Sequence, residues 1–289
     1  MVEYLFNKII GEKNEKMDML KKLNVKFEKY TYKCEDSIIN ERYEKICQKK
    51  WEMYFSNPED RGNPDILGVY KKEFKIPENW KTKLQTRLDF PCTFEYNLAH
   101  KTYNASLIFL DDNKFLAIEA PSSKNIKSFF ELVDKYDISH FVKLNAPNEY
   151  SEDYYHFWED RNTGEKDVLK FSKGNVKLLS YIWKNREAGN PEIICDMVED
   201  IYKGNNGKII AVSCRGGAGR TATFIAAYTL IKEIKNQNSQ GIDISNVNIS
   251  IDRILWEILI QRPYAIAFGT QYNNLYRIID TYVSRHLEK

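Results

Sequence analysis

A short apolar run that leads into a glycine-rich loop constrains the fold of this chain more than any other feature of the sequence. Residues 209–212 are all apolar, which is typical of a strand buried on both faces of a sheet. Glycine follows at positions 216, 217 and 219, and a helical pattern extends over about 221–235. The order of strand, glycine-rich loop and helix predicts an α/β domain whose loop lies at the carboxyl end of a buried strand.

The segments on either side of this loop alternate between strand and helix patterns. We predict strands at 105–109, 115–119, 139–144 and 176–183, and helices at 123–136, 192–202, 244–261 and 271–286. A turn at 111–113 (Asp-Asp-Asn) separates the first two strands, and a polar linker at 236–241 follows the helix after the loop. The mixture favours an α/β fold with a central mixed sheet flanked by helices.

The N-terminal part of the chain differs in character from the rest. Residues 1–55 have a charged helical pattern with one apolar stripe, which predicts a helix packed on the body of the protein. Residues 56–68 (SNPEDRGNPDILG) are dense in Pro, Gly, Asn and Asp, which indicates a loop. We therefore expect an N-terminal, mostly helical extension over residues 1–80 and a domain over residues 81–289 that carries the glycine-rich loop.

The composition excludes several functional classes. Apolar residues make up 43% and aromatic residues 13% of the 289 residues, so the chain can bury a sizeable core. The 43 basic and 41 acidic side chains give a net charge of +2, which provides no global signal for nucleic acid or an anionic membrane. No apolar run approaches the ~20 residues of a membrane span, and residues 1–15 lack the features of a signal peptide. We expect a cytoplasmic protein with no nucleic-acid partner, no transmembrane segment and no signal peptide.

The cysteines and histidines do not form a metal or disulfide pattern. The chain has five cysteines, an odd number, with wide spacing and no CxxC pair, and its four histidines are scattered. We expect no metal and no cofactor. Four of the cysteines are expected to be small buried hydrophobic residues, namely Cys34, Cys47, Cys92 and Cys195. The neighbours of Cys214 indicate a different role for that residue.

The glycine-rich loop begins with Cys214 and ends with Arg220. Its glycines let the backbone turn so that successive N–H groups form an anion-binding nest, to which the following helix adds its positive end. Such a loop binds a phosphate dianion. The residues expected to bind it are Arg215, Gly216, Gly217, Ala218 and Gly219. Arg220 can hold two phosphate oxygens with its planar fork, and the Cys214 thiolate can attack phosphorus. Neither the GK[ST] ending of a nucleotide P-loop nor a GxGxxG pattern is present.

The pattern Cys-x5-Arg-Thr at residues 214–221 resembles the active-site motif of the protein tyrosine phosphatase superfamily. The residues of the motif, Cys-Arg-x-Gly-x-Gly-Arg-Thr-Ala, are similar to those of secreted bacterial tyrosine phosphatases. The similarity extends over about residues 85–285 and favours the larger tyrosine-specific fold. The segments that match the family in order are 103–106 (YNAS), 119–121 (EAP, where the family has QGP), 154–158 (YYHFW), 261–263 (QRP) and 271–272 (QY).

The resemblance implies a protein tyrosine phosphatase that forms a cysteinyl-phosphate on Cys214. Thr221 would then hydrogen-bond the sulfur as it leaves, and the partner would be a phosphotyrosine-containing protein. Two alternatives stay open. Arg215 adds a positive charge that suits a phosphoinositide substrate, and a phosphotyrosine-binding adaptor with little turnover would also keep the loop. If the chain is a bacterial effector, as the sequence of its loop suggests, it would be delivered into a host cell.

The general acid departs from the family pattern. The family uses an aspartate in a Trp-Pro-Asp loop to protonate the leaving phenolate. In the corresponding stretch, residues 183–191 (WKNREAGNP), counting forward from Trp183 places Asn185 in that position, and asparagine has no catalytic proton. Counting back from residues 189–191 places Glu187 there. We expect Glu187 to be the acid, with a solvated loop carboxylate as the alternative interpretation.

Other family positions also differ here. Ser213 replaces the histidine that precedes the nucleophile, and Ala267 stands where the family has the glutamine that positions the hydrolytic water. Gln271 matches a second family glutamine and is expected to position the water, although it could simply be a polar residue at a helix start. The phosphotyrosine-recognition loop has two candidates, residues 40–43 (NERY) and 86–89 (TRLD). Glu149 is a candidate partner for the active-site arginine, or an ordinary surface residue.

Overall fold

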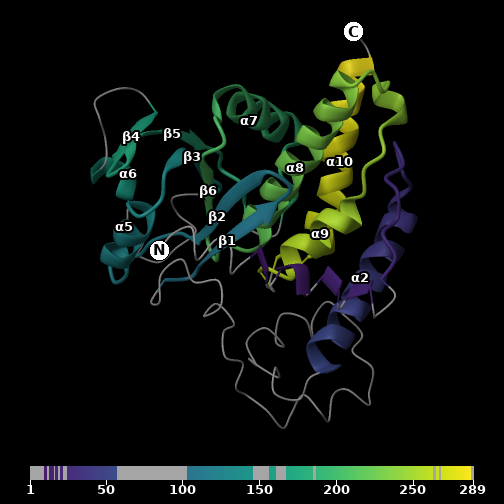
Figure 1. The fold of residues 1–289 in the computed structure, drawn as a ribbon, viewed down its shortest axis with the longest axis horizontal. Helices are drawn as coiled ribbons and strands as arrows, with labels where there is room; N and C mark the ends of the chain where they lie inside the picture. Colours follow the sequence, from purple (N-terminus) through teal and green to yellow (C-terminus); the bar gives the residue numbers. More distant parts are fainter. Residues whose placement is uncertain are drawn as a thin grey trace.

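One mixed sheet organises the part of the chain that the computed structural model describes. That part comprises residues 10–11, 13–15, 17–18, 20–21, 25–56, 103–145, 156–160, 167–184, 187–262, 265–266 and 268–287. Within it, six strands form a sheet in the order β1-β2-β6-β3-β5-β4 (Figure 1). The strands are β1 Ala105–Leu110, β2 Asn113–Glu119, β3 Ile138–Lys143, β4 Val168–Phe171, β5 Gly174–Ser180 and β6 Ile209–Cys214.

The four inner strands are parallel and the two outer strands antiparallel. β6 pairs in parallel with β2 on one side and β3 on the other, and β3 pairs in parallel with β5. β1 and β4 are hairpin partners of β2 and β5 at the two edges. Because parallel strands end at the same edge of a sheet, the chain that follows β2, β3, β5 and β6 emerges at one edge. β6 is buried along its whole length, as a strand covered on both faces requires.

Helices cover both faces of the sheet (Figure 1). Their bounds are α2 Asp36–Ser56, α5 Ile126–Val133, α6 Phe157–Asp160, α7 Pro191–Gly204, α8 Gly219–Ser239, α9 Ile251–Leu259 and α10 Gly269–Leu287, with a 3₁₀ turn, η3, at Ile244–Asn246. α5 and α6 share one buried cluster with one face of the sheet, in which Phe129, Phe141 and Phe157 pack with ring centroids 4.8 to 6.0 Å apart. The other face carries the larger cluster, which is formed by α2 and α7 to α10.

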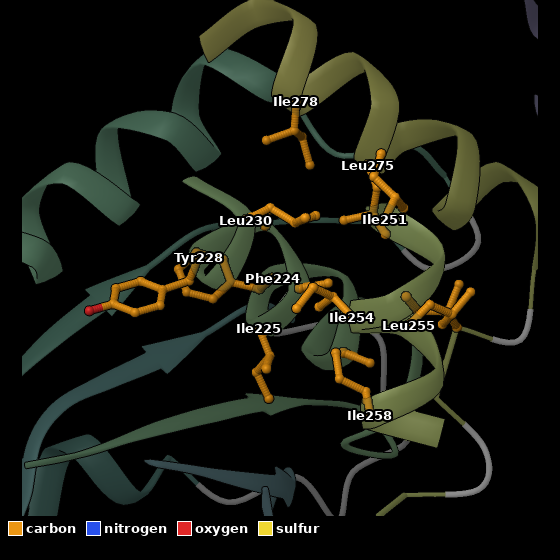
Figure 2. Close-up of a cluster of buried hydrophobic side chains, with 14 of the residues drawn as sticks. Phe224, Ile225, Tyr228, Leu230, Ile251, Ile254, Leu255, Ile258, Leu275 and Ile278 are labelled. Carbon is orange, nitrogen blue, oxygen red and sulfur yellow. The ribbon is translucent and has the colours of Figure 1, made fainter. Parts of the chain in front are cut away.

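α8 is the central helix of that larger cluster. Residues 220–231 of this helix are buried on every side, which is what a helix enclosed by other elements requires. Figure 2 shows its side chains, among them Phe224, Ile225 and Leu230, meeting apolar side chains of α9 and α10. Because α8 begins at Gly219, directly after the glycine-rich loop, this packing also fixes where the loop ends.

The N-terminal segment packs into the same core. The Tyr30 backbone N–H donates to the Ile249 carbonyl at 2.9 Å, and the Tyr30 hydroxyl bonds the carboxylate of Asp280 on α10. Tyr43 on α2 is 5% exposed, and its ring lies 5.3 Å from that of Tyr272. Residues 25–49 are therefore joined to the helices of the main domain. The boundary that we predict at residue 80 lies outside the described residues.

The predicted α/β class, with a central mixed sheet flanked by helices and a helical N-terminal segment, is confirmed. The five predicted strands and the helices at 123–136, 192–202 and 271–286 appear within a few residues of their expected bounds. β4 and α6 were not predicted, and α8 continues to Ser239 through most of the expected linker.

The predicted helix over 244–261 is wrong, because the segment is divided into η3 and α9. The break follows Asn246, where Val247 leaves the helical conformation, and the Ser250 hydroxyl then caps the new helix by accepting from Arg253 N. None of the described helices is long and apolar enough to cross a membrane.

Tyr43→Ala is expected to lower the free energy of unfolding by about 3 kcal/mol, because it removes a buried ring between α2 and α10. Ile38→Ala is the control, since Ile38 lies on the same helix with 43% of its surface exposed and should change stability by about 0.5 kcal/mol or less. Urea unfolding followed by circular dichroism measures both. Equal, small losses in the two variants would show that α2 does not contribute to the core.

Candidate active site

Cys214 is the last residue of the central strand β6. It lies directly opposite Glu119 of β2 in the parallel register. Its carbonyl accepts hydrogen bonds from Ala120 N at 2.9 Å and from Gly217 N at 3.2 Å, so the chain starts to turn immediately after it. The side chain is 2% exposed. The strand thus places the cysteine at the floor of the loop, at the edge where the parallel strands end.

The glycines of the loop meet different constraints. Gly217 has φ +61°, and a Cβ there would lie 2.4 Å from the carbonyl carbon of Ile118. A Cβ on Gly219 would lie 2.4 Å from Nε2 of Gln271, whereas a Cβ on Gly216 would meet nothing within 4 Å. Position 217 therefore needs glycine for the close approach of β2, whereas at position 219 the contact is with the end of the flexible Gln271 side chain, which can shift. Position 216 does not need glycine.

Arg220 lies in the first turn of α8 and is 2% exposed. Its Nη1 donates to the carbonyl of Trp183 at 2.5 Å and is 3.5 Å from that of Leu144. Leu144 directly follows β3, and Trp183 lies three residues after β5. The guanidinium is therefore directed at the edge of the sheet where Cys214 also lies.

Arg262 holds the glycine-rich loop from its outer side. It follows α9, is fully buried, and donates from Nη1 to Ser106 Oγ at 2.8 Å and from Nη2 to Asn104 Oδ1 at 3.0 Å. The same guanidinium donates to the Gly216 carbonyl at 3.0 Å and to the Gly217 carbonyl through Nε. A trans peptide directs its N–H opposite to its carbonyl, so the Ala218 N–H points away from Arg262. These bonds fix the carbonyls of the loop on its outer side.

The charge of Arg262 is retained despite its burial. Burial lowers the pKa of Arg262 to about 10, while the nearby Cys214 and Glu119 act in the opposite direction. A pKa of about 10 still leaves the guanidinium protonated at neutral pH. The loop carbonyls therefore bond a guanidinium that is positively charged at neutral pH.

Glu119, at the end of β2, belongs to the same polar cluster. Burial raises the pKa of its carboxyl above the ordinary value. A hydrogen bond from Asn104 and the positive charges of Arg262 and Arg215 partly offset that shift. The sequence indicated the segments that contain Asn104, Glu119 and Arg262 but gave no role to these side chains. Their role follows from contacts with residues that are distant in the sequence.

The segment that we predict to carry the general acid is fastened through backbone atoms. The indole N–H of Trp183 donates to the Glu187 carbonyl at 2.8 Å, and Gly189 packs directly on the Trp183 ring. In the orientation that satisfies its donors and acceptors, the buried Asn274 amide bonds both N and O of Gly189 at 3.0 Å. Asn190 then caps α7 by accepting from Glu192 N at 2.9 Å.

The Glu187 side chain itself faces solvent in this structure. It is 60% exposed, and its carboxylate lies 3.8 Å from Nζ of Lys184. The other candidate, Asn185, lies outside the described residues, as do Ala267 and Glu149. The acid role of Glu187 stays a prediction.

Four buried side chains around the loop have polar atoms without a hydrogen-bond partner among the described residues. They are Ser213 Oγ, Thr221 Oγ1, Gln271 Oε1 and both amide atoms of Asn145. Ser213 and Thr221 are adjacent to Cys214 and Arg220, and Gln271 lies against Gly219. Unpaired buried polar atoms cost free energy, so their concentration here marks a region built to receive polar groups.

Of the two candidate recognition loops, residues 40–43 lie within α2. The Tyr43 hydroxyl donates to the Ile266 carbonyl at 3.2 Å, so this buried tyrosine supports the segment before Gln271 and is not available to a substrate. Residues 86–89 lie outside the described part of the chain. Within the described residues, no cluster of three or more His, Cys, Asp or Glu could hold a metal ion.

Comparisons with known proteins agree with this geometry. A family model described as protein-tyrosine phosphatase matches residues 172–281. Tyrosine-protein phosphatase 1 of Schizosaccharomyces pombe is 24% identical over 245 residues, which are 71% of this chain and 42% of that protein. This chain thus spans less than half the length of that relative.

A solved structure described as "Structural basis of PTPN18 fingerprint on distinct HER2 tyrosine phosphorylation sites" shares the fold. Its TM-score is 0.50 at 18% identity, and the match covers 64% of this chain and 75% of the other. The structure defines an α/β protein with a Cys-x5-Arg loop at the carboxyl edge of its sheet. Over residues 172–281 the chain is similar to protein tyrosine phosphatases, and its fold resembles that of the solved phosphatase structure.

Gly217→Ala is expected to lower the free energy of unfolding by about 2 kcal/mol or more, because the new Cβ meets the backbone of β2 and the residue has a positive φ. Gly216→Ala is the matched control in the same loop and should change stability by about 0.5 kcal/mol or less. Urea unfolding of both variants tests the geometry of the loop. A larger loss for Gly216→Ala than for Gly217→Ala would contradict it.

Proposed function

We propose that this protein hydrolyses phosphotyrosine in proteins through a cysteinyl-phosphate on Cys214. The observation that supports this most directly is the placement of Cys214 at the end of β6, beneath a glycine loop whose carbonyls are held outward by Arg262. That arrangement leaves the inner side of the loop, with Ala218 N–H and the start of α8, for an anion.

In the first step, the Cys214 sulfur attacks phosphorus in line with the tyrosine oxygen. The P–S bond forms as the P–O bond to tyrosine breaks, and Glu187 donates the proton that the leaving phenolate needs. Arg220 stabilises the equatorial oxygens of the phosphoryl group with its planar fork. The products of this step are free tyrosine side chain and cysteinyl-phosphate.

In the second step, water attacks the cysteinyl-phosphate. The P–O bond forms as the P–S bond breaks, the proton of the water passes to Glu187, and inorganic phosphate leaves. Thr221, whose Oγ1 is buried and unpaired within the described structure, donates to the departing sulfur. Gln271, whose buried Oε1 is likewise unpaired there and lies beside Gly219, orients the water.

The first test compares substrates and removes the nucleophile. Wild type is expected to release phosphate faster from a phosphotyrosine peptide than from a soluble phosphoinositide, and Cys214→Ser should reduce kcat by about 10³-fold or more while peptide binding persists. Cys34→Ser, a cysteine outside the loop, is the control and should keep full activity. Faster release from the phosphoinositide would contradict the proposed substrate and indicate a phosphoinositide phosphatase. Peptide binding without hydrolysis by the wild type would indicate an adaptor.

The second test concerns the acid. Glu187→Gln is expected to reduce kcat for the phosphotyrosine peptide by about 10²-fold and to abolish the fall in rate on the alkaline side of the pH profile, because the amide has no proton to lose. Asp196→Asn removes an exposed carboxylate of α7 and should leave the profile unchanged. An alkaline limb that persists in Glu187→Gln would assign the acid to another residue.

A further inference from the structure

Glu119 is held rigidly at the edge of the phosphate-binding loop. It is the last residue of β2, opposite Cys214 in the register. Its backbone N–H donates to the Asn104 carbonyl at 3.0 Å, and its carbonyl accepts from the Tyr103 hydroxyl at 2.9 Å. The carboxyl side chain therefore starts from a fixed point beside the nucleophile.

Asn104 connects this carboxyl to the support of the loop. Its side-chain amide donates to the Glu119 carboxyl, and its Oδ1 accepts from Arg262 Nη2 at 3.0 Å. Arg262 in turn bonds the carbonyls of Gly216 and Gly217. A continuous chain of hydrogen bonds thus runs from Glu119 to the backbone that would cradle a phosphate.

The charges around Glu119 come from three elements. Arg215 of the loop and Arg262 after α9 are its positive neighbours, and Arg262 also faces Cys214 of β6. Tyr103 and Asn104 are the other polar groups in contact with it, and both are neutral at physiological pH. A phosphate dianion in the loop would add negative charge close to the Glu119 carboxylate.

Two negative groups that share the same arginines repel each other, and the repulsion is strong where water is excluded. Glu119 can remove it by taking a proton. Burial raises the pKa of this carboxyl, and the added negative charge acts in the same direction. The family pattern has glutamine at this position, and an amide cannot respond in this way.

We propose that Glu119 takes up a proton from solvent when a phosphate dianion enters the loop, so that the affinity for phosphate falls as pH rises. The inference deepens the proposed function, on which it rests, by adding a positioning residue that sets the charge of the phosphate site. It predicts that the protein works best on phosphotyrosine under mildly acidic conditions for a reason separate from the general acid.

The test measures binding without catalysis. Sulfate is the probe, because it is a tetrahedral dianion at every pH used and carries no proton of its own. Cys214→Ser and the double variant Cys214→Ser/Glu119→Gln are titrated with sulfate between pH 6 and pH 8. Calorimetry gives Kd, and a pH indicator in weakly buffered solution gives the protons taken up.

Cys214→Ser is expected to take up a fraction of a proton per sulfate, and its Kd should rise by about tenfold from pH 6 to pH 8. In the double variant the uptake should vanish and Kd should change by less than about twofold. Cys214→Ser/Glu233→Gln is the matched control, because Glu233, in the second half of α8, is another half-buried glutamate with a raised pKa but pairs with Arg253 of α9. It should behave like Cys214→Ser.

Equal proton uptake with and without Glu119 would overturn the proposal, as would failure of Cys214→Ser to bind sulfate. Phosphatase activity of the wild type is measured separately, so loss of this inference would leave the proposed function standing. If the double variant does not fold, infrared spectra of Cys214→Ser decide: the band of a protonated carboxyl should grow on addition of sulfate, and its absence would contradict the proposal.

Discussion

The buried guanidinium of Arg262 is the interaction on which the geometry of the loop depends. A segment with three glycines has many backbone conformations, so its shape must be imposed by its surroundings. Arg262 imposes it by binding two successive carbonyls of the loop, and Ser106 and Asn104 hold Arg262 in turn. The start of β1 and an arginine three residues beyond α9 therefore determine the conformation of a loop that follows β6.

A buried positive charge must be offset by negative charge or hydrogen bonds within reach. For Arg262 the offsetting groups are Cys214, Glu119 and the polar side chains of β1. The proposed nucleophile and a carboxyl thus share one guanidinium, and a change of charge on either alters the field at the other. Because of this coupling, a change of charge at position 119 alters the electrostatic field at Cys214 more strongly than a change of charge at the surface would.

Local patterns were sufficient to predict the α/β class and the loop, since β6 is uniformly apolar and the glycines of 216–219 directly follow it. They failed over 244–261, where the apolar pattern continues but the chain leaves the helical conformation at Val247 and a Ser250 cap starts a new helix. They could not assign a role to Arg262, whose partners Ser106 and Asn104 lie 156 and 158 residues away in sequence. Contacts at such a separation depend on how the strands are ordered in the sheet, which local periodicity does not encode.

The same limit applies to the segment that carries Glu187. The amino-acid sequence places a carboxylate between Trp183 and the start of α7. The position of that segment, however, is set by backbone contacts, including the bonds of Gly189 to Asn274 on α10. Arg220 joins that segment to the loop by donating to the Trp183 carbonyl. A guanidinium has five N–H donors, so Arg220 can keep this bond through Nη1 while other donors of its fork face a phosphate. The same side chain that is proposed to hold the phosphoryl group therefore also holds the start of the segment that carries Glu187, so the position of that segment depends on contacts that the local sequence does not encode.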